Sequence, residues 1–100
     1  MRWRRRPRML AMLASSEATM TLPDGVALHA RPAALFVRTA MRFRSKIVVA
    51  ANGREADAKS ILSVLGLGAT AGTTLVVRAD GEDAAAARDA LAETLAGVVE

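Results

Sequence analysis

The sequence predicts an α+β fold in which helices cover one face of a largely antiparallel sheet. The hydrophobic period switches several times along the chain between strand-like alternation and helical spacing, and the resulting element order is βαββαβα. Each predicted strand has one apolar side, which is typical of a sheet that is buried on one face only. Neither a repeat nor an internal linker rich in Gly, Ser or Pro interrupts this order, so we expect one small domain.

The first strand and the first helix are predicted at residues 17–22 and 30–41. Along the strand, Ala18, Met20 and Leu22 point to one side, and the sequence Pro23-Asp24-Gly25 ends it. Along the helix, apolar residues recur at helical spacing, and we expect this stripe to face the core. The stripe consists of Ala33, Phe36, Val37 and Ala40.

A β-hairpin is predicted at residues 47–57. Residues 47–51 alternate and are rich in β-branched side chains. Asn52-Gly53 is the strongest local signal for a two-residue type I′ turn, because both turn positions require a positive φ. Residues 54–57 then form the short returning strand.

The remaining elements are a short helix at residues 60–65, a strand at 73–79 and a helix at 83–98. Ser60 is the expected N-cap of the short helix, and Gly66 and Gly68 are expected to close it. Glu82 and Asp83 precede the last helix, where the helix dipole favours acidic side chains. The last helix has one apolar stripe, made of Ala84, Ala87, Leu91, Leu95 and Val98.

The composition provides few residues of the types that act in catalysis. The chain has 100 residues, of which 52% are hydrophobic and only three are aromatic, so an aliphatic core is expected. The absence of Cys excludes a disulfide framework, a thiolate zinc site and a cysteine nucleophile, and the single His excludes a multi-histidine metal site. No apolar run approaches the roughly 20 residues of a membrane span.

The positive net charge of +4 comes from the start of the chain. Five arginines before residue 9 contribute +5, and residues 9–100 contribute −1. The folded part is therefore close to neutral and does not indicate nucleic-acid binding. We expect residues 1–15 to be a basic, disordered leader or the result of an early start codon, and residues 16–100 to form the domain. The alternative for the leader is an RNA- or lipid-binding arm.

The single histidine lies directly before the predicted first helix, in the segment His29-Ala30-Arg31-Pro32. Pro32 suits the first turn of a helix, where backbone N–H groups have no helical partner. These N–H groups, the positive end of the helix dipole and the Arg31 guanidinium favour an anion such as phosphate. Because a neutral imidazole is a competent nucleophile for phosphoryl transfer, His29 is a candidate phosphohistidine. The alternative is that His29 only caps the helix and Arg31 is a solvated charge.

The segment from His29 to Ala34, with the sequence His-Ala-Arg-Pro-Ala-Ala, resembles the active-site motif of the HPr family. These are the phosphocarrier proteins of the bacterial phosphoenolpyruvate-dependent sugar phosphotransferase system. The similarity continues through the Asn52-Gly53 hairpin, the segments 58–62 and 65–68, residues 72–79 and the Ala-rich last helix. It covers residues 16–100.

The resemblance implies an HPr-like open-faced β-sandwich, with a four-stranded antiparallel sheet and three helices on one face. It also implies a phosphoryl carrier rather than an enzyme. In this family the histidine that matches His29 accepts the phosphoryl group from enzyme I on its Nδ1 atom and passes it to sugar-specific IIA proteins or domains. The helix-start amides at Ala30 and Arg31, together with the Arg31 side chain, hold the phosphate. A cytoplasmic monomer without cofactor, metal, membrane or nucleic-acid partner is the corresponding expectation.

The resemblance further assigns a regulatory and a docking role. Ser60 matches the family's regulatory serine, the target of an HPr serine kinase, and the alternative is a plain N-cap. The residues that match the docking surface for enzyme I and IIA are Ala34, Arg38, Ile61, Leu62 and Leu65. For Ile61 and Leu65 core packing is the competing interpretation, because apolar residues at helical spacing usually face inward. Leu62 is the better candidate for an exposed contact.

The sequence also departs from the family's pattern. The loop at residues 23–28 is longer than in typical members, and Ala27 stands where a glycine often precedes the motif. We expect this loop to alter the approach to His29 without removing its chemistry.

Other functions remain open at this point. One is an HPr-like carrier of another phosphorelay, such as the dihydroxyacetone kinase or a nitrogen-related branch. Another is a regulatory protein that keeps the fold without being phosphorylated. An RNA-binding domain would need stacking aromatic residues on its strands, whereas Trp3, Phe36 and Phe43 lie outside the predicted strands.

Overall fold

The computed structural model describes residues 15–23, 25–28 and 30–97. The elements are β1 (Ser15–Thr21), α2 (Ala30–Ala40), β2 (Lys46–Ala51), β3 (Arg54–Asp57), α3 (Ile61–Leu65), β4 (Thr74–Asp80) and α4 (Ala84–Gly97). This confirms the predicted order βαββαβα, and every element ends within two residues of its predicted bounds. Ser15, the last residue assigned to the leader, is the first residue of β1. The rest of the leader, Asp24, His29 and Val98 lie outside the described residues.

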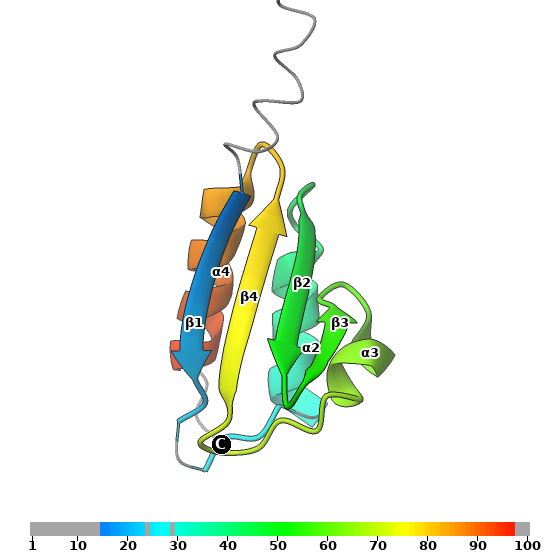
Figure 1. The fold of residues 1–100 in the computed structure, drawn as a ribbon, viewed down its shortest axis with the longest axis vertical. Helices are drawn as coiled ribbons and strands as arrows, with labels where there is room; N and C mark the ends of the chain where they lie inside the picture. The colour runs from blue at the N-terminus through cyan, green and yellow to red at the C-terminus, as the bar shows by residue number, and fades with distance from the viewer. Residues whose placement is uncertain (1–14, 24, 29, 98–100) are drawn as a thin grey trace, which may run out of the picture.

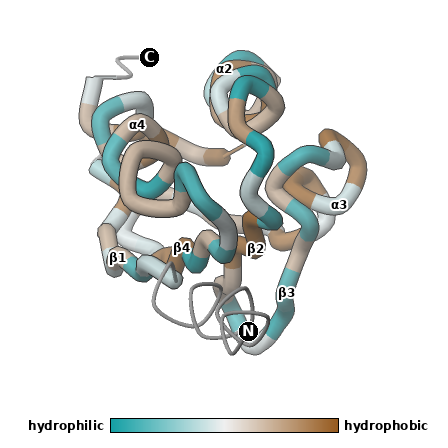
Figure 2. The backbone as a smooth tube through the Cα atoms, turned by 90° about the horizontal axis from the view of Figure 1, so that it is seen from above, coloured by the Kyte–Doolittle hydropathy of each residue, from teal (hydrophilic) through white to brown (hydrophobic). Residues whose placement is uncertain are grey.

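The four strands form one antiparallel sheet in the order β1-β4-β2-β3. The helices α2 and α4 lie over one face of this sheet, and α3 lies on the same side, next to β3 (Figures 1 and 2). Val49 of β2 pairs with Val77 of β4, which in turn pairs with Ala18 of β1. Val49 and Val77 are fully buried beneath the helices. The α+β class and the one-sided helical layer are therefore confirmed.

The core is aliphatic and surrounds one aromatic side chain, Phe36. The predicted inward stripe of α2 is buried, and so is the stripe of α4 over its described length. Phe36 belongs to one buried cluster with the largest aliphatic side chains, which are Leu22, Leu28, Ile47, Leu75 and Leu91. Because these come from the loop before α2, the two central strands and α4, a single core holds all the layers together.

The Asn52-Gly53 turn joins β2 to β3 as predicted. Ala51 pairs with Arg54 across the turn, and φ is +54° at Asn52 and +75° at Gly53. Positive φ at both central positions is the signature of a type I′ hairpin, whose twist matches that of the flanking strands.

Figure 1 defines two ends of the sheet, which we call the lower end and the upper end. The lower end comprises the loop before α2, the start of α2, the tip of the β2–β3 hairpin, α3 and residues 66–73. The upper end comprises the α2–β2 loop, the β4–α4 loop and the start of β1. The candidate motif is therefore at the lower end.

At the upper end, the Asp83 carboxylate joins two loops. It accepts hydrogen bonds from the backbone N–H groups of Arg44, at 2.9 Å, and of Ser45, at 3.0 Å. The Ser45 hydroxyl also donates to it, and Ser45 is buried. These bonds hold the pKa of Asp83 below its ordinary value, and the bond from the Ser45 side chain has the largest effect. Asp83 thus precedes α4 as predicted, but its carboxylate secures the α2–β2 loop.

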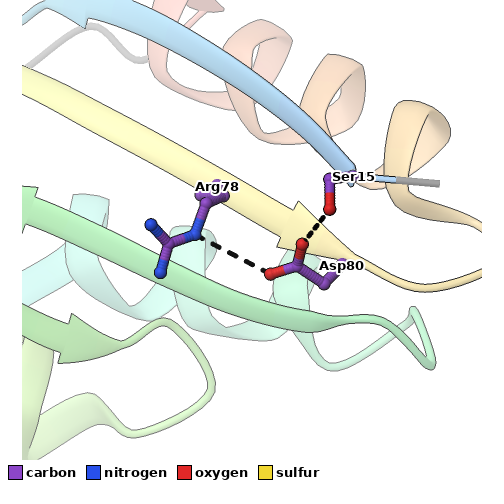
Figure 3. A network of polar contacts seen from close by, with 3 residues as sticks. All are labelled: Ser15, Arg78 and Asp80. Atoms are coloured by element: carbon purple, nitrogen blue, oxygen red, sulfur yellow. Dashed lines mark hydrogen bonds and ion pairs between the residues drawn. The ribbon is translucent and has the colours of Figure 1, made fainter. Parts of the chain in front are cut away.

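A second polar contact lies at the same end, where β1 begins (Figure 3). The Ser15 hydroxyl donates to the Asp80 carboxylate, and Arg78 Nε lies 3.7 Å from the other carboxylate oxygen. The side chains of Arg78 and Asp80 are both nearly half exposed, so this ion pair contributes at most about 1 kcal/mol to stability.

Candidate functional site

The loop before α2 is packed into the core. Leu22, Val26 and Leu28 are 2%, 3% and 1% exposed, respectively. The N–H of Val26 donates to the carbonyl of Pro23 at 3.1 Å, and φ of Gly25 is +80°, which fits the third position of a type II turn. The burial of Val26 and Leu28 was not predicted from the sequence. It gives the long loop a defined path towards the start of α2.

The backbone just before His29 is tied to a neighbouring segment. The N–H of Leu28 donates to the carbonyl of Ala69 at 2.9 Å. Leu22, at the start of the loop, exchanges hydrogen bonds with Gly72 and Thr73. His29 itself is outside the described residues, so its role as the phosphohistidine stays a prediction. Its sequence neighbour Leu28 is held in place by both burial and a hydrogen bond.

The start of α2 has a strained residue. Ala30 has φ of +47°, in the left-handed region that L-amino acids with a side chain rarely adopt. Such a conformation costs on the order of 1–3 kcal/mol and occurs preferentially at functional sites. Pro32 follows within the first turn and is buried, as the motif predicts. The first-turn N–H groups of this helix lack helical partners and can bind an anion.

Arg31 and two docking candidates share one face of α2. Arg31, Ala34 and Arg38 are spaced three and four residues apart, which places them on the same side of the helix. Arg31 and Arg38 are exposed, and Ala34 is partly buried. Arg31 makes no ion pair with any other described residue, so its guanidinium is available to an anion at the helix start.

The short helix α3 has three exposed hydrophobic side chains, which we call the α3 cluster. Leu62 is 78% exposed, Ile61 is 38% and Leu65 is 37%, whereas Val64 is completely buried. Core packing of Ile61 and Leu65 is therefore wrong. Viewed down the helix axis, Val64 and Leu62 lie on opposite sides, and the other two lie between them. The helix α3 lies beside α2 (Figure 2).

Ser60 is the N-cap of α3, as predicted. Its hydroxyl accepts a hydrogen bond from the N–H of Ser63 at 3.3 Å, and its backbone is extended. At the other end of the helix, Gly66 caps with φ of −66°, and Gly68 is the residue that takes a positive φ, of +64°. A regulatory role for Ser60 is not tested by this geometry.

The hairpin tip contacts the segment that follows α3. Arg54 Nη1 donates to the carbonyl of Gly66 at 3.1 Å, and Asn52 Nδ2 donates to the carbonyl of Leu67 at 3.1 Å. From the sequence, Asn52 is explained by the turn alone, and Arg54 has no predicted role. Because the partners are 12 and 15 residues away, no local pattern could have identified these bonds.

Among residues 15–23, 25–28 and 30–97, no group of three or more His, Asp or Glu side chains could hold a metal ion. None of the helices within those ranges is long and apolar enough to cross a bilayer.

Comparisons with known proteins all lead to one family. Residues 15–97 match the family model described as "PTS HPr component phosphorylation site". The chain is 43% identical over 77 residues to the phosphocarrier protein HPr of Xylella fastidiosa, covering 77% of this chain and 86% of that protein. It is similar to the crystal structure of HPr-C-His from Thermoanaerobacter tengcongensis, with a TM-score of 0.78 and 38% identity over 81% of this chain and 91% of that one. It is also similar to the crystal structure of a phosphocarrier protein HPr from Bacillus anthracis. Here the TM-score is 0.77 and the identity is 34%, over 82% of this chain and 98% of that one.

Proposed function

This chain belongs to the HPr family of phosphocarrier proteins of the phosphotransferase system, and we propose that His29 is the residue that carries its phosphoryl group. The observation behind this proposal is the motif His29-Ala30-Arg31-Pro32 at the start of α2, within the stretch that matches the family's phosphorylation-site model. The amides at Ala30 and Arg31 and the Arg31 guanidinium would hold the phosphoryl oxygens.

The donor in this proposal is phosphorylated enzyme I. A ring nitrogen of His29 attacks the phosphorus in line, the bond from phosphorus to the donor's histidine breaks, and the donor nitrogen leaves with the electron pair. Transfer to a IIA protein repeats this step with His29 as the leaving group. Because the broken and formed bonds are alike, positioning and stabilisation of the phosphoryl charge supply the catalysis. An exposed Arg31 is suited to that purpose.

The surface that we propose for both partners combines the α3 cluster with the exposed face of α2. Leu62, at 78% exposed, is the most exposed residue of its apolar part, and Arg31 and Arg38 supply positive charge from α2. A partner with an apolar patch and an acidic rim complements this surface. We expect the carrier to act as a monomer, because each transfer requires this face to be free. A cytoplasmic location is proposed on family membership alone.

Ser60 is the proposed regulatory residue. A phosphate on its hydroxyl would lie at the start of α3, directly beside the α3 cluster. The added negative charge would repel the acidic rim of a partner, so an HPr serine kinase acting here would reduce docking.

The decisive experiment is intact-mass spectrometry of the full chain after incubation with phosphoenolpyruvate, Mg²⁺ and enzyme I from the same host. We expect one added phosphoryl group that is acid-labile, maps to His29 and is absent from the His29→Ala variant. The variant should retain the wild-type melting temperature.

Acid-labile phosphate on His29→Ala would contradict the assignment of the residue. An unmodified wild-type chain, with the same enzyme I active on another carrier, would contradict enzyme I as the donor. The donors of the dihydroxyacetone kinase and nitrogen-related branches would then be tested.

A further inference from the structure

The α3 cluster needs support from outside its own helix. An isolated helix shorter than about 12 residues is marginal in water, and α3 has five residues. Val64 is its only buried side chain, since the three large ones face solvent. The N-cap bond from Ser63 to Ser60 is long, at 3.3 Å. Within the helix itself, burial and capping therefore hold α3 weakly, and its position depends on the residues that follow it.

The polar part of this support comes from the β2–β3 hairpin. Arg54 Nη1 and Asn52 Nδ2 donate to the carbonyls of Gly66 and Leu67, which directly follow the helix. The guanidinium lies at the negative end of the helix, where a cation is favourable. Arg54 takes part in no ion pair within the described ranges, and the partner of its guanidinium is the Gly66 carbonyl.

The anchor is itself rigid. The turn is closed by the pairing of Ala51 with Arg54, and β2 is hydrogen-bonded on both sides, to β3 and to β4. The two donors thus extend from the sheet to the segment that follows α3, in which Leu67 and Ala69 are buried. We call that segment, residues 66–69, the junction segment.

The junction segment also reaches the motif. Its last residue, Ala69, accepts the hydrogen bond from Leu28, which precedes His29 in the sequence. One short stretch of chain thus connects the hairpin, the α3 cluster and the loop before α2. Figure 1 shows these parts together at the lower end.

We propose that Arg54 and Asn52 are positioning residues for partner docking, which hold the α3 cluster in its docking geometry through the carbonyls of the junction segment. This proposal rests on the proposed function, because it assumes that the α3 cluster contacts enzyme I. Neither side chain needs to touch the phosphoryl group or the partner. Their removal should affect association with the partner and leave the chemical step intact.

The test is steady-state phosphoryl transfer from enzyme I to the full chain, with KM and kcat measured separately. Asn52→Gly keeps a residue that adopts positive φ and removes the amide donor, so the hairpin is retained. Arg54→Ala removes the other donor, and Arg54→Lys restores one that can reach a single carbonyl. Arg78→Ala is the matched control, because it removes the same charge from an exposed site on β4.

We expect Asn52→Gly and Arg54→Ala each to raise KM roughly fivefold with kcat unchanged, the effect of one lost hydrogen bond. Arg54→Lys should recover most of the wild-type KM, and Arg78→Ala should leave it unchanged. Amide exchange of residues 62–68 should become faster in the first two variants only.

Unchanged KM in both Asn52→Gly and Arg54→Ala would overturn the proposal. An equal rise in Arg54→Ala and Arg78→Ala would overturn it as well, since charge alone would then explain the effect. Failure of the proposed function is a separate outcome, because the wild-type chain would then accept no phosphoryl group from enzyme I. If Arg54→Ala proves unstable, the KM of Asn52→Gly still tests the proposal.

Discussion

The two ends of the sheet are held together in different ways. At the upper end, buried Ser45 and the Asp83 carboxylate close two loops with three hydrogen bonds to one charged group. At the lower end, Ala30 takes a left-handed conformation, and three large apolar side chains of α3 face solvent. The upper end has one exposed large apolar side chain, Met41, whereas the lower end has three of them together with the strained Ala30.

This difference indicates where the molecule can accept a loss of stability in return for function. A strained Ala30 and an exposed α3 cluster are unfavourable for folding alone. Both lie at the end with the phosphoryl-carrier motif, and the upper end contains no part of that motif. The comparison therefore predicts that substitutions at the lower end change transfer more than stability, and that substitutions at the upper end do the reverse.

The largest expected effect is that of Arg31→Ala at the lower end. Loss of a charge-stabilising donor should slow phosphoryl transfer about 10²- to 10³-fold, with little change in melting temperature. Rapid-quench measurement of transfer from enzyme I checks this. Arg42→Ala is the charge-matched control, just beyond the other end of α2. Equal slowing in both variants would reduce the role of Arg31 to general electrostatics.

Gly81→Ala at the upper end should show the opposite pattern. A Cβ at Gly81 would lie 2.6 Å from the Ser45 hydroxyl oxygen and 2.9 Å from the Ser45 Cα, so the backbone must shift. We expect a loss of about 1–3 kcal/mol in the free energy of unfolding, measured by urea titration, with unchanged transfer kinetics. Gly97→Ala meets no atom within 4 Å and should be tolerated. A Gly81→Ala variant as stable as Gly97→Ala would argue against close packing at this end.

The two roles of Ser60 can be separated by a pair of variants. Ser60→Ala removes the N-cap of α3 and should cost about 1 kcal/mol of stability. Ser60→Asp preserves an N-cap acceptor, so its stability should stay near wild type, while its charge weakens binding to enzyme I. Calorimetric titration with enzyme I measures the second effect. Identical affinities for wild type and Ser60→Asp would remove the case for regulation by charge at this position.

The smallest effect concerns Asp83 and appears on acidification. The pKa of Asp83 is lowered in the folded chain, below the 3.8 of an unperturbed aspartate. Its contribution to stability is therefore complete above that value and is lost as the pH falls through the folded-state pKa. Urea midpoints from pH 7 down to about pH 2 should show an acid-dependent loss in the wild type that is reduced in Asp83→Asn. Parallel profiles would mean that the carboxylate charge does not contribute.

The sequence predicted the elements well and their long-range polar contacts poorly. The alternation of Val49 and the helical spacing of Phe36 reflect burial, which periodicity reports directly. By contrast, Asp83 binds backbone groups 38 and 39 residues away, and nothing local marks such a partner. Ile61 and Leu65 could not be assigned to the core or the surface, since a helix of five residues makes too few turns to define a buried face.

Parts of the candidate site were predictable for a different reason. The Asn52-Gly53 turn and the Ser60 cap follow from local backbone chemistry, and both were confirmed. The phosphoryl role of His29 rests on a motif and on family membership, because a single histidine has no pattern of its own. The burial of Val26 in the long loop escaped prediction, as the loop has no regular period.

The position of Ser15 has a practical consequence for experiments that fix the protein to a solid support. β1 begins at the upper end and runs over seven residues, about 20 Å, towards the lower end. A biotinylated tag joined directly ahead of Ser15 would attach the domain at the end opposite the α3 cluster. On a sensor chip, every molecule would then be attached at the same point, away from the α3 cluster, and the support would not block that surface.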